Sequence, residues 1–148
     1  MKPEVDLVLR SVMGKLLAEV APALGDAYVR SNVEVMAVLM ASAAEEYERA
    51  ADVRVEENRA MRLIFADAAA FVEEGQFRAR LEAAAGERET SLRVSELNAT
   101  NDRYRALLIE LHAFVEERGE EWARKINRAI WQELRASANR RAISFYPL

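Results

Sequence analysis

The only histidine of the chain, His112, lies in a segment that also carries five glutamates between positions 110 and 121. A histidine among carboxylates could ligate a metal ion or act as a general base. On a helix, however, only residues three or four positions apart share a face, so Glu116 is the one carboxylate neighbour of His112. The spacing therefore predicts a structural His112–Glu116 pair at the edge of a buried helix face.

The chain offers few side chains that could bind a transition metal. Ferritin-like carboxylate bundles, which resemble the all-α helical bundle expected for this chain, hold two metal ions with two Glu-x-x-His motifs and two further glutamates. This chain has no Glu-x-x-His motif, no cysteine and a single histidine, whereas a zinc site needs three or four ligands. We therefore expect no metal centre of these kinds and no cofactor.

The pair Glu45 and Glu48, in the stretch EEYE, offers a weak alternative site for magnesium. It resembles the Glu-x-x-Glu half of the metal site in the all-α nucleotide pyrophosphohydrolases, and that resemblance implies a magnesium ion near a triphosphate. The second half of that pattern, Glu-x-x-Asp, is absent from the chain. The spacing therefore favours a solvated helix face on which Glu45 pairs with Arg49.

Arg105 and His112, separated by six residues, carry a second alternative. Their spacing resembles the arginine–histidine motif of the HEPN family of helical-bundle ribonucleases. That resemblance implies RNA cleavage without metal, with His112 in acid–base chemistry and Arg105 steadying the phosphoryl charge. Ala106 stands where those enzymes often place a polar residue. If the bundle instead holds a small ligand, Tyr104, Arg105, His112 and Glu116 are the candidates to contact it.

Composition indicates one folded domain over residues 1–148. Hydrophobic residues make up 51% of the 148 residues and charged residues 31%, which argues against disorder. The absence of cysteine excludes disulfides and thiolate sites and favours a cytoplasmic location. The longest run without charge, residues 35–44, is about half of the ~20 residues needed to cross a bilayer. No association with a membrane is expected.

The first helix is predicted to run from Pro3 to about Ala21, where Pro22 and Gly25 end it. Asp26 stands where it can cap the next helix. Apolar residues at helical spacing predict a buried stripe on the first helix, formed by Val5, Val8, Leu9, Val12, Leu16 and Val20.

Residues 27–74 contain neither glycine nor proline, and apolar positions recur in steps of three and four. One unbroken helix of this length would exceed the usual size of a small domain, because each residue adds about 1.5 Å. Arg54 and Glu57 also interrupt the apolar stripe. We expect a bend or break near residues 51–55, with a long helix shared across a dimer as the alternative.

Glycines divide the remainder of the chain. Gly75 and Gly86 bracket a short helix, and the loop that follows offers Thr90 or Ser91 as a cap for the next helix. That helix is apolar over a wide arc and should lie centrally, and Gly119 either separates it from a last helix or lies within one continuous helix. Together these segments predict an all-α, antiparallel helical bundle of four or five main helices, one of them long and bent.

Charge and polarity bear on contacts within and between chains. Residues 1–75 carry a net charge of −6 and residues 76–148 a net charge of +2, an asymmetry that favours docking of the basic C-terminal helix against acidic helices of its own fold, with contact between molecules as the alternative. Asn101 lies on an apolar stripe, where it fixes the register of an oligomer, bonds within its own chain or belongs to a helix start at NATND. The apolar tail, residues 140–148, must pack within or between chains.

We therefore expect a non-catalytic bundle that forms a homodimer or binds a protein partner. No nucleic-acid partner is expected.

Overall fold

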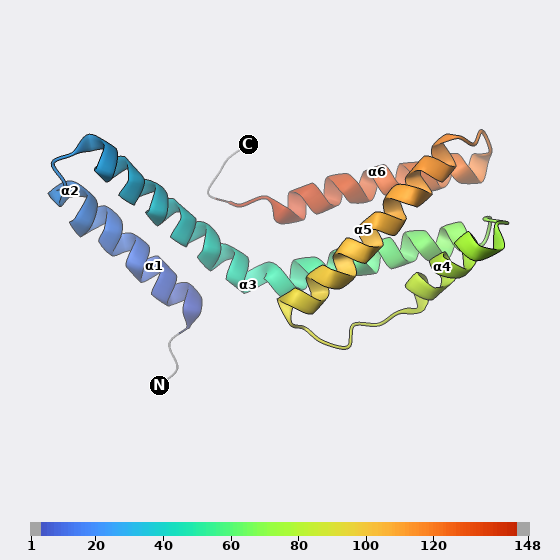
Figure 1. The fold of residues 1–148 in the computed structure, drawn as a ribbon, viewed down its shortest axis with the longest axis horizontal. Coiled ribbons are helices and arrows are strands. Elements are labelled where there is room, and N and C mark those ends of the chain that lie inside the picture. The colour runs from blue at the N-terminus through green and yellow to red at the C-terminus, as the bar shows by residue number, and fades with distance from the viewer. Residues whose placement is uncertain (1–3, 145–148) are drawn as a thin grey trace. The chain divides into compact units, whose positions relative to one another are not determined.

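The computed structural model describes residues 4–144, and these are helical without any strand. The prediction of an all-α helical bundle with four or five main helices is confirmed. In chain order the elements are α1 (Val5–Lys15), the π-helical stretch η1 (Leu16–Val20), α2 (Ala21–Ala23), α3 (Ala27–Ala69), α4 (Gly75–Gly86), α5 (Val94–Glu116) and α6 (Glu121–Arg141) (Figure 1).

The first helical segment ends later than predicted and is not a regular α-helix throughout. Its predicted start, Pro3, lies outside the described residues, and helical structure continues through Ala23. Pro22 is the second residue of α2, directly after η1, and has no amide hydrogen to donate to the preceding turn. Within η1 the hydrogen bonds span five residues, as in the bond from the Ala21 amide to the Leu16 carbonyl.

Asp26 caps α3 as predicted. Its Oδ1 accepts hydrogen bonds from the amides of Tyr28, at 2.8 Å, and Val29, at 3.1 Å. These amides have no carbonyl partner inside the helix, so the aspartate satisfies donors that would otherwise be left to water. The turn between α2 and α3 is further closed by Arg30, which donates to the Leu24 carbonyl at 2.9 Å.

Of the bend or break predicted near residues 51–55, the break does not occur, because α3 is helical without interruption from Ala27 to Ala69. The alanines, arginines and glutamates of this segment have high helix propensity, and no glycine or proline interrupts them. The two polar residues that interrupt the stripe find partners inside the protein. Arg54 donates to Asn98 Oδ1 at 2.8 Å, and Glu57 is fully buried in a hydrogen-bonded network.

The loop between α4 and α5 departs from the prediction at its end. Helix α5 begins at Val94, and its N-cap residue, Arg93, makes no side-chain cap bond. Ser91 Oγ accepts instead from the Arg93 amide at 3.1 Å, so neither Thr90 nor Ser91 caps the helix. Gly119 lies between α5 and α6 and separates two helices.

The chain divides into two compact units, and the boundary falls within α3 after Ala50. Of the described residues, unit 1 contains residues 4–50 and 142–144, and unit 2 contains residues 51–141. The single-domain description stays a prediction. Residues 145–148 of the predicted tail lie outside the described residues, and Ser144 packs within unit 1, where its amide donates to Glu45 Oε1 at 3.0 Å.

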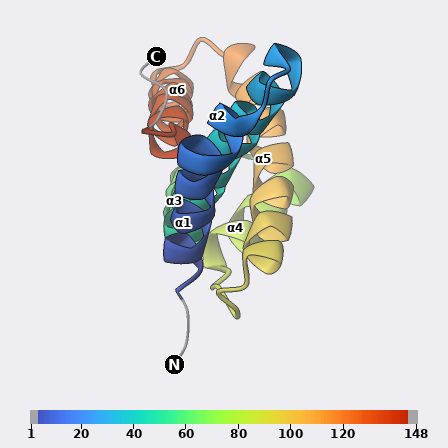
Figure 2. The same ribbon diagram turned by 90° about the vertical axis from the view of Figure 1, so that its left-hand side faces the viewer.

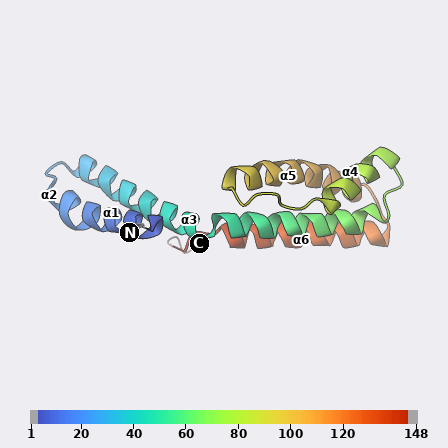
Figure 3. The same ribbon diagram turned by 90° about the horizontal axis from the view of Figure 1, so that it is seen from below.

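Unit 2 has two layers, one formed by α6 with the second half of α3 and the other by α4 with α5 (Figures 2 and 3). Large side chains from all four helices fill the space between them. The rings of Phe65 and Tyr104 meet edge to face at 5.7 Å between centroids. The largest fully buried side chains include Tyr104, Phe65, Met61, Leu81, Leu97, Leu111, Ile126 and Ile130.

Unit 1 is a helical hairpin in which α1 lies beside the first half of α3 (Figures 1 and 3). No residue of α1 is buried, so the predicted buried stripe on this helix is wrong for the single chain. Val5, Val8, Val12 and Val20 are 37–45% exposed because the hairpin has no further layer to cover them. Among residues 4–50 and 142–144, the buried hydrophobic residues are all alanines: Ala21, Ala37, Ala41, Ala44 and Ala50.

Candidate functional site

The most polar part of the interior of unit 2 surrounds Glu57 of α3. Its side chain is 0% exposed, as is that of the next residue, Asn58. Asn101 of α5 and Ser137 of α6 are buried beside them, at 2% and 6% exposure. A buried carboxylate is costly unless it is paired and hydrogen-bonded, so its partners determine whether this part of the fold is stable.

The carboxylate of Glu57 accepts hydrogen bonds from side chains of α5 and α6. Arg141 donates from Nε to Oε1 at 2.7 Å and from Nη2 to Oε2 at 2.6 Å, a two-pronged pair that matches the planar carboxylate. Ser137 Oγ donates to Oε1 at 2.6 Å and Asn101 Nδ2 to Oε2 at 3.1 Å. Arg105 Nη2 reaches Oε2 at 3.4 Å. Both carboxylate oxygens are therefore satisfied.

These contacts control the ionisation of Glu57. Burial alone would raise the pKa of its carboxyl group. The hydrogen bonds from Arg141 and Ser137, together with the positive charges of Arg141 and Arg105, outweigh burial and lower the pKa to about 2. Glu57 is therefore a carboxylate near neutral pH, and it holds two guanidinium groups in place.

Asn101 connects α5 to this network from both ends of its amide. Its Nδ2 donates to Asn58 Oδ1 at 2.9 Å as well as to Glu57, and its Oδ1 accepts from Arg105 Nε at 2.7 Å. Of the roles predicted for Asn101, hydrogen bonding within its own chain is confirmed, whereas a helix start at NATND is wrong because α5 begins at Val94. The amide leaves Arg105 with a fixed orientation.

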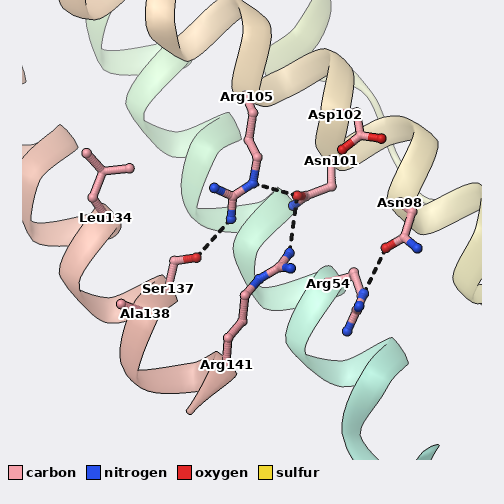
Figure 4. A pocket seen from close by; sticks show the side chains of 9 residues that line it. All are labelled: Arg54, Asn98, Asn101, Asp102, Arg105, Leu134, Ser137, Ala138 and Arg141. Carbon is pink, nitrogen blue, oxygen red and sulfur yellow. Dashed lines mark hydrogen bonds between the residues drawn. The ribbon is translucent and has the colours of Figure 1, made fainter. Parts of the chain in front are cut away.

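A pocket of about 590 Å³ opens above the network (Figure 4). Ser137 and Arg105, joined by a 2.9 Å hydrogen bond, lie on one side of it, and Arg54 with Asn98 lies on another. Three helices supply the lining residues: Arg54 from α3; Asn98, Asn101, Asp102 and Arg105 from α5; and Leu134, Ser137, Ala138 and Arg141 from α6. The size is in the range of small-molecule sites.

The candidate ligand-binding residues predicted from the sequence do not meet in one pocket. Arg105 lines the pocket above Glu57, whereas Tyr104 points to α4 and donates to Glu87 Oε2 at 3.0 Å and to the Ala84 carbonyl at 3.2 Å. Tyr104 instead lines a second pocket, of about 450 Å³, beside the loop that joins α4 to α5. Tyr104 and Arg105, although adjacent in the sequence, therefore contact different parts of unit 2.

His112 has partners of its own on α5 and α6. Its Nε2 lies 3.1 Å from Asn127 Oδ1 and 3.3 Å from Glu116, and its ring meets Trp131 edge to face at 5.3 Å. The predicted His112–Glu116 pair is confirmed. His112 is not among the residues that line the pocket with Arg105, and the ribonuclease hypothesis stays a prediction.

The two carboxylates considered for magnesium differ in their surroundings. Glu45 accepts a hydrogen bond from Ser144 Oγ at 2.7 Å and pairs with Arg49 at 3.3 Å, so the predicted Glu45–Arg49 pair is confirmed. Glu48 is exposed. Across residues 4–144 no three histidine, aspartate or glutamate side chains are grouped as metal ligands would be.

Three residues at the centre of this site were not predicted as site residues: Glu57, Ser137 and Arg141. One signal was present in the sequence, because Glu57 interrupts an otherwise apolar helix stripe. A charged residue at such a position needs a buried partner. The partner could not be identified from spacing, since Arg141 is 84 residues further along the chain.

Comparison with protein-family profiles, with curated protein sequences and with solved structures gives no match for this chain. Among the helices of residues 4–144, none combines the length and the apolar character that a membrane span requires. The arguments for function therefore rest on the geometry of the two units.

Proposed function

We propose that the chain is a non-catalytic protein that forms a homodimer through the helical hairpin of unit 1. The observation that carries this proposal is a set of exposed apolar side chains, which we call the hairpin face. They are 37–54% exposed in the single chain. The hairpin face comprises Val5, Val8 and Val12 of α1 and Val29, Met36 and Tyr47 of α3.

Helix geometry supports a single continuous face. On α1 the exposed stripe lies beside Leu9 and Met13, which are partly buried in the hairpin, and on α3 it lies beside the buried residues Ala37 and Ala44. At about 100° per residue, both stripes are rotated from the packed stripe in the same sense. In an antiparallel pair of helices, equal rotations bring both stripes to the same side of the hairpin.

The spacing along α3 supports pairing with another helix. The stripe continues through Val33, Met40 and Ala43 in alternating steps of four and three, the repeat with which helices pack in coiled coils and four-helix bundles. No charged residue occupies this series between positions 29 and 47.

A second copy of this chain is the occupant that best fits such a face. In a two-fold symmetric interface each surface meets its own equivalent, so charges near the axis would oppose like charges. An uncharged face avoids that repulsion. Two hairpins packed face to face would form a four-helix bundle and replace the missing layer above an alanine core. A cytoplasmic location is part of the same proposal.

The test is the mass of the full chain in solution, measured by analytical ultracentrifugation over a range of concentrations. We expect a dimer of the 16.7 kDa chain. Met36→Glu or Val8→Glu would place charges on the hairpin face and should shift the equilibrium to the monomer, because two buried like charges would meet across the interface.

Val35→Glu provides the matched control. Val35 is also on α3 and is 55% exposed, but it directly precedes Met36 and lies about 100° around the helix from it, outside the hairpin face. We expect this variant to remain dimeric. A parent chain that is monomeric at every concentration, or a Val35→Glu variant that dissociates as readily as Met36→Glu, would refute the proposal.

A further inference from the structure

The outer side of α6 carries an exposed row of basic side chains. Arg124, Arg128 and Arg135 lie within about 40° of one another around the helix and along about 16 Å of its length. Lys125 is exposed beside them, and we call these four residues the basic row. Glu121, in the first turn, is the one carboxylate on this side of α6, so the row presents an excess of positive charge.

The basic row differs from most other arginines of unit 2 in having no carboxylate partner. Arginines elsewhere in the unit pair with glutamates, as Arg80 does with Glu110 at 2.7 Å. Among residues 4–144, by contrast, no hydrogen bond or ion pair holds a side chain of the basic row. The positive charge of the row is therefore not balanced by neighbouring groups and can interact with a partner.

An apolar surface borders the basic row on the side of α5. Trp131 follows Arg128 by three residues on α6 and is 57% exposed. Its ring meets that of His112 on α5, and Ile109, one turn before His112 on the same side of α5, is 70% exposed. Trp131 and Ile109 thus form an exposed apolar centre on two neighbouring helices.

An apolar centre bordered by arginines is typical of a surface that binds another protein. Tryptophan and arginine are enriched among the residues that contribute most to protein–protein binding, and polar groups form the rim of such interfaces. A guanidinium group recognises a carboxylate, so charge complementarity requires an acidic partner. A peptide segment with several carboxylates and one or two large apolar side chains would cover both the basic row and the apolar centre.

Nucleic acid fits this surface less well. Single-stranded nucleic acid stacks successive bases on aromatic side chains, whereas the apolar centre combines one indole ring with an aliphatic side chain, Ile109. A long polyanion would also extend beyond the basic row and meet other surfaces of a chain whose net charge is −4. A short acidic peptide contacts the row alone.

We propose that the outer side of α6 binds an acidic, partly apolar peptide segment of a protein partner. Its carboxylates would lie against the basic row, and its apolar side chain against Trp131 and Ile109. The proposal goes beyond homodimer formation, which uses the hairpin face of unit 1, and it would stand if the chain proved monomeric.

Binding of a fluorescein-labelled peptide to the full chain, measured by fluorescence anisotropy, tests this surface. The probe repeats the sequence Glu-Glu-Leu-Ala-Glu-Leu-Ala twice, and the same peptide with lysine in place of glutamate is the control for charge. We expect saturable binding of the acidic peptide and none of the lysine peptide. Added salt should weaken the binding, because it screens exposed charges.

Replacing the three arginines of the row together, as Arg124→Gln, Arg128→Gln and Arg135→Gln, should weaken binding about tenfold or more. Each exposed charge pair contributes up to about fivefold in affinity. Trp131→Ala should also weaken binding about tenfold, because it removes the largest apolar contact. The melting temperature of the triple variant should match that of the parent, since the row makes no side-chain bonds within the described residues.

The matched control removes three exposed arginines from other parts of unit 2, as Arg59→Gln, Arg78→Gln and Arg88→Gln together. It makes the same change in net charge outside the basic row, and it should bind the acidic peptide as tightly as the parent does. Three results would overturn the proposal: no saturable binding of the acidic peptide, equal affinities in the parent and the triple variant of the row, or tighter binding of a labelled oligouridylate than of the peptide.

Discussion

The two units of the chain place their apolar side chains in opposite ways. Unit 2 buries rings and long aliphatic side chains, among them Tyr104, Phe65 and Leu111. The described part of unit 1 buries only alanines, although it contains about a third of the described residues. Of the eighteen large apolar side chains that are exposed among residues 4–144, twelve lie between positions 5 and 47. Unit 2 therefore has a hydrophobic core of its own, whereas the large apolar side chains of unit 1 are mostly exposed in the single chain.

The units also differ in their treatment of charge. Unit 2 buries Glu57 together with two asparagines and a serine, and every one of these polar residues is hydrogen-bonded. Among the described residues of unit 1 no charged residue is fully buried, although Glu45 and Arg49 are partly buried. Buried polar networks require accurate positions of all their members, so they belong in a unit whose packing is complete. An apolar face without charges is instead suited to contact with another molecule.

The largest effect is expected from Glu57→Gln. Loss of the carboxylate leaves Arg141 and Arg105 without their buried counter-ion, and breaking a buried ion pair in this way costs about 3–5 kcal/mol of unfolding free energy. Chemical denaturation measures the change. Glu56→Gln is the control, because Glu56 is the adjacent residue with a half-exposed side chain and should cost less than about 0.5 kcal/mol. Similar losses in both variants would mean that the network adds nothing specific to unit 2.

Acid should weaken unit 2 through the same carboxylate. The pKa of the Glu57 carboxyl group is about 2 in the folded chain and near 4.5 in the unfolded chain. Its contribution to the unfolding free energy is therefore complete above pH 4.5 and is lost as the pH falls from there towards 2. The shift corresponds to about 3 kcal/mol of unfolding free energy. The unfolding free energy, obtained from chemical denaturation at each pH, should therefore fall more steeply with decreasing pH for the parent than for Glu57→Gln.

Other carboxylates titrate in the same range and define the background of this measurement. The pKa values of Glu87 and Glu89 are also lowered, by hydrogen bonds from Arg103 and Arg62 that outweigh burial, and they add to the acid dependence. Burial raises the pKa of Glu133, which acts in the opposite direction. Because all three remain in Glu57→Gln, parallel pH curves for the parent and this variant would contradict the prediction.

A smaller effect is expected from replacing one valine by alanine in each unit, which compares how much each valine contributes to the unfolding free energy. Val115→Ala, at a position 2% exposed in unit 2, should cost roughly 2 kcal/mol, because it removes the equivalent of two buried methylene groups and leaves a cavity. Val12→Ala, at 37% exposure in unit 1, should cost less than about 0.5 kcal/mol in the monomer. Thermal unfolding measures both losses, at protein concentrations below those at which the proposed dimer forms. Equal losses would show that the hairpin has a core comparable to that of unit 2.

Much of the helical architecture could be predicted from the sequence because local signals determine it. Periodic apolar residues indicated the helices, Asp26 capped α3, and Gly75, Gly86 and Gly119 lie at or between helix ends. The break, one of two alternatives predicted for α3 beside a bend, does not occur. Its prediction gave domain size more weight than helix propensity. The buried stripe predicted on α1 failed for another reason, since periodicity identifies an apolar face but not the molecule that covers it.

The candidate site was less predictable because its contacts join distant parts of the chain. Arg105 was identified as a candidate, but it was grouped with Tyr104 and His112, which lie on the same helix. In the structure its neighbours come from α3 and α6, through Glu57 and Ser137. Spacing along one helix could not indicate these partners, since helix packing alone brings them together.

The π-helical stretch Leu16–Val20 affects the direction in which the end of the first helical segment points. In a regular α-helix Val20 would be rotated by about 80° from Val12, because eight residues exceed two turns. A π turn accommodates one extra residue and takes back about the same rotation, so Val20 returns to the row of Val5, Val8 and Val12. Deleting one residue from this stretch would leave a regular α-helix in which Val20 follows Val12 by seven residues, or about two turns, so the row would be kept. The π turn thus lets the chain carry one more residue while its first apolar row stays aligned.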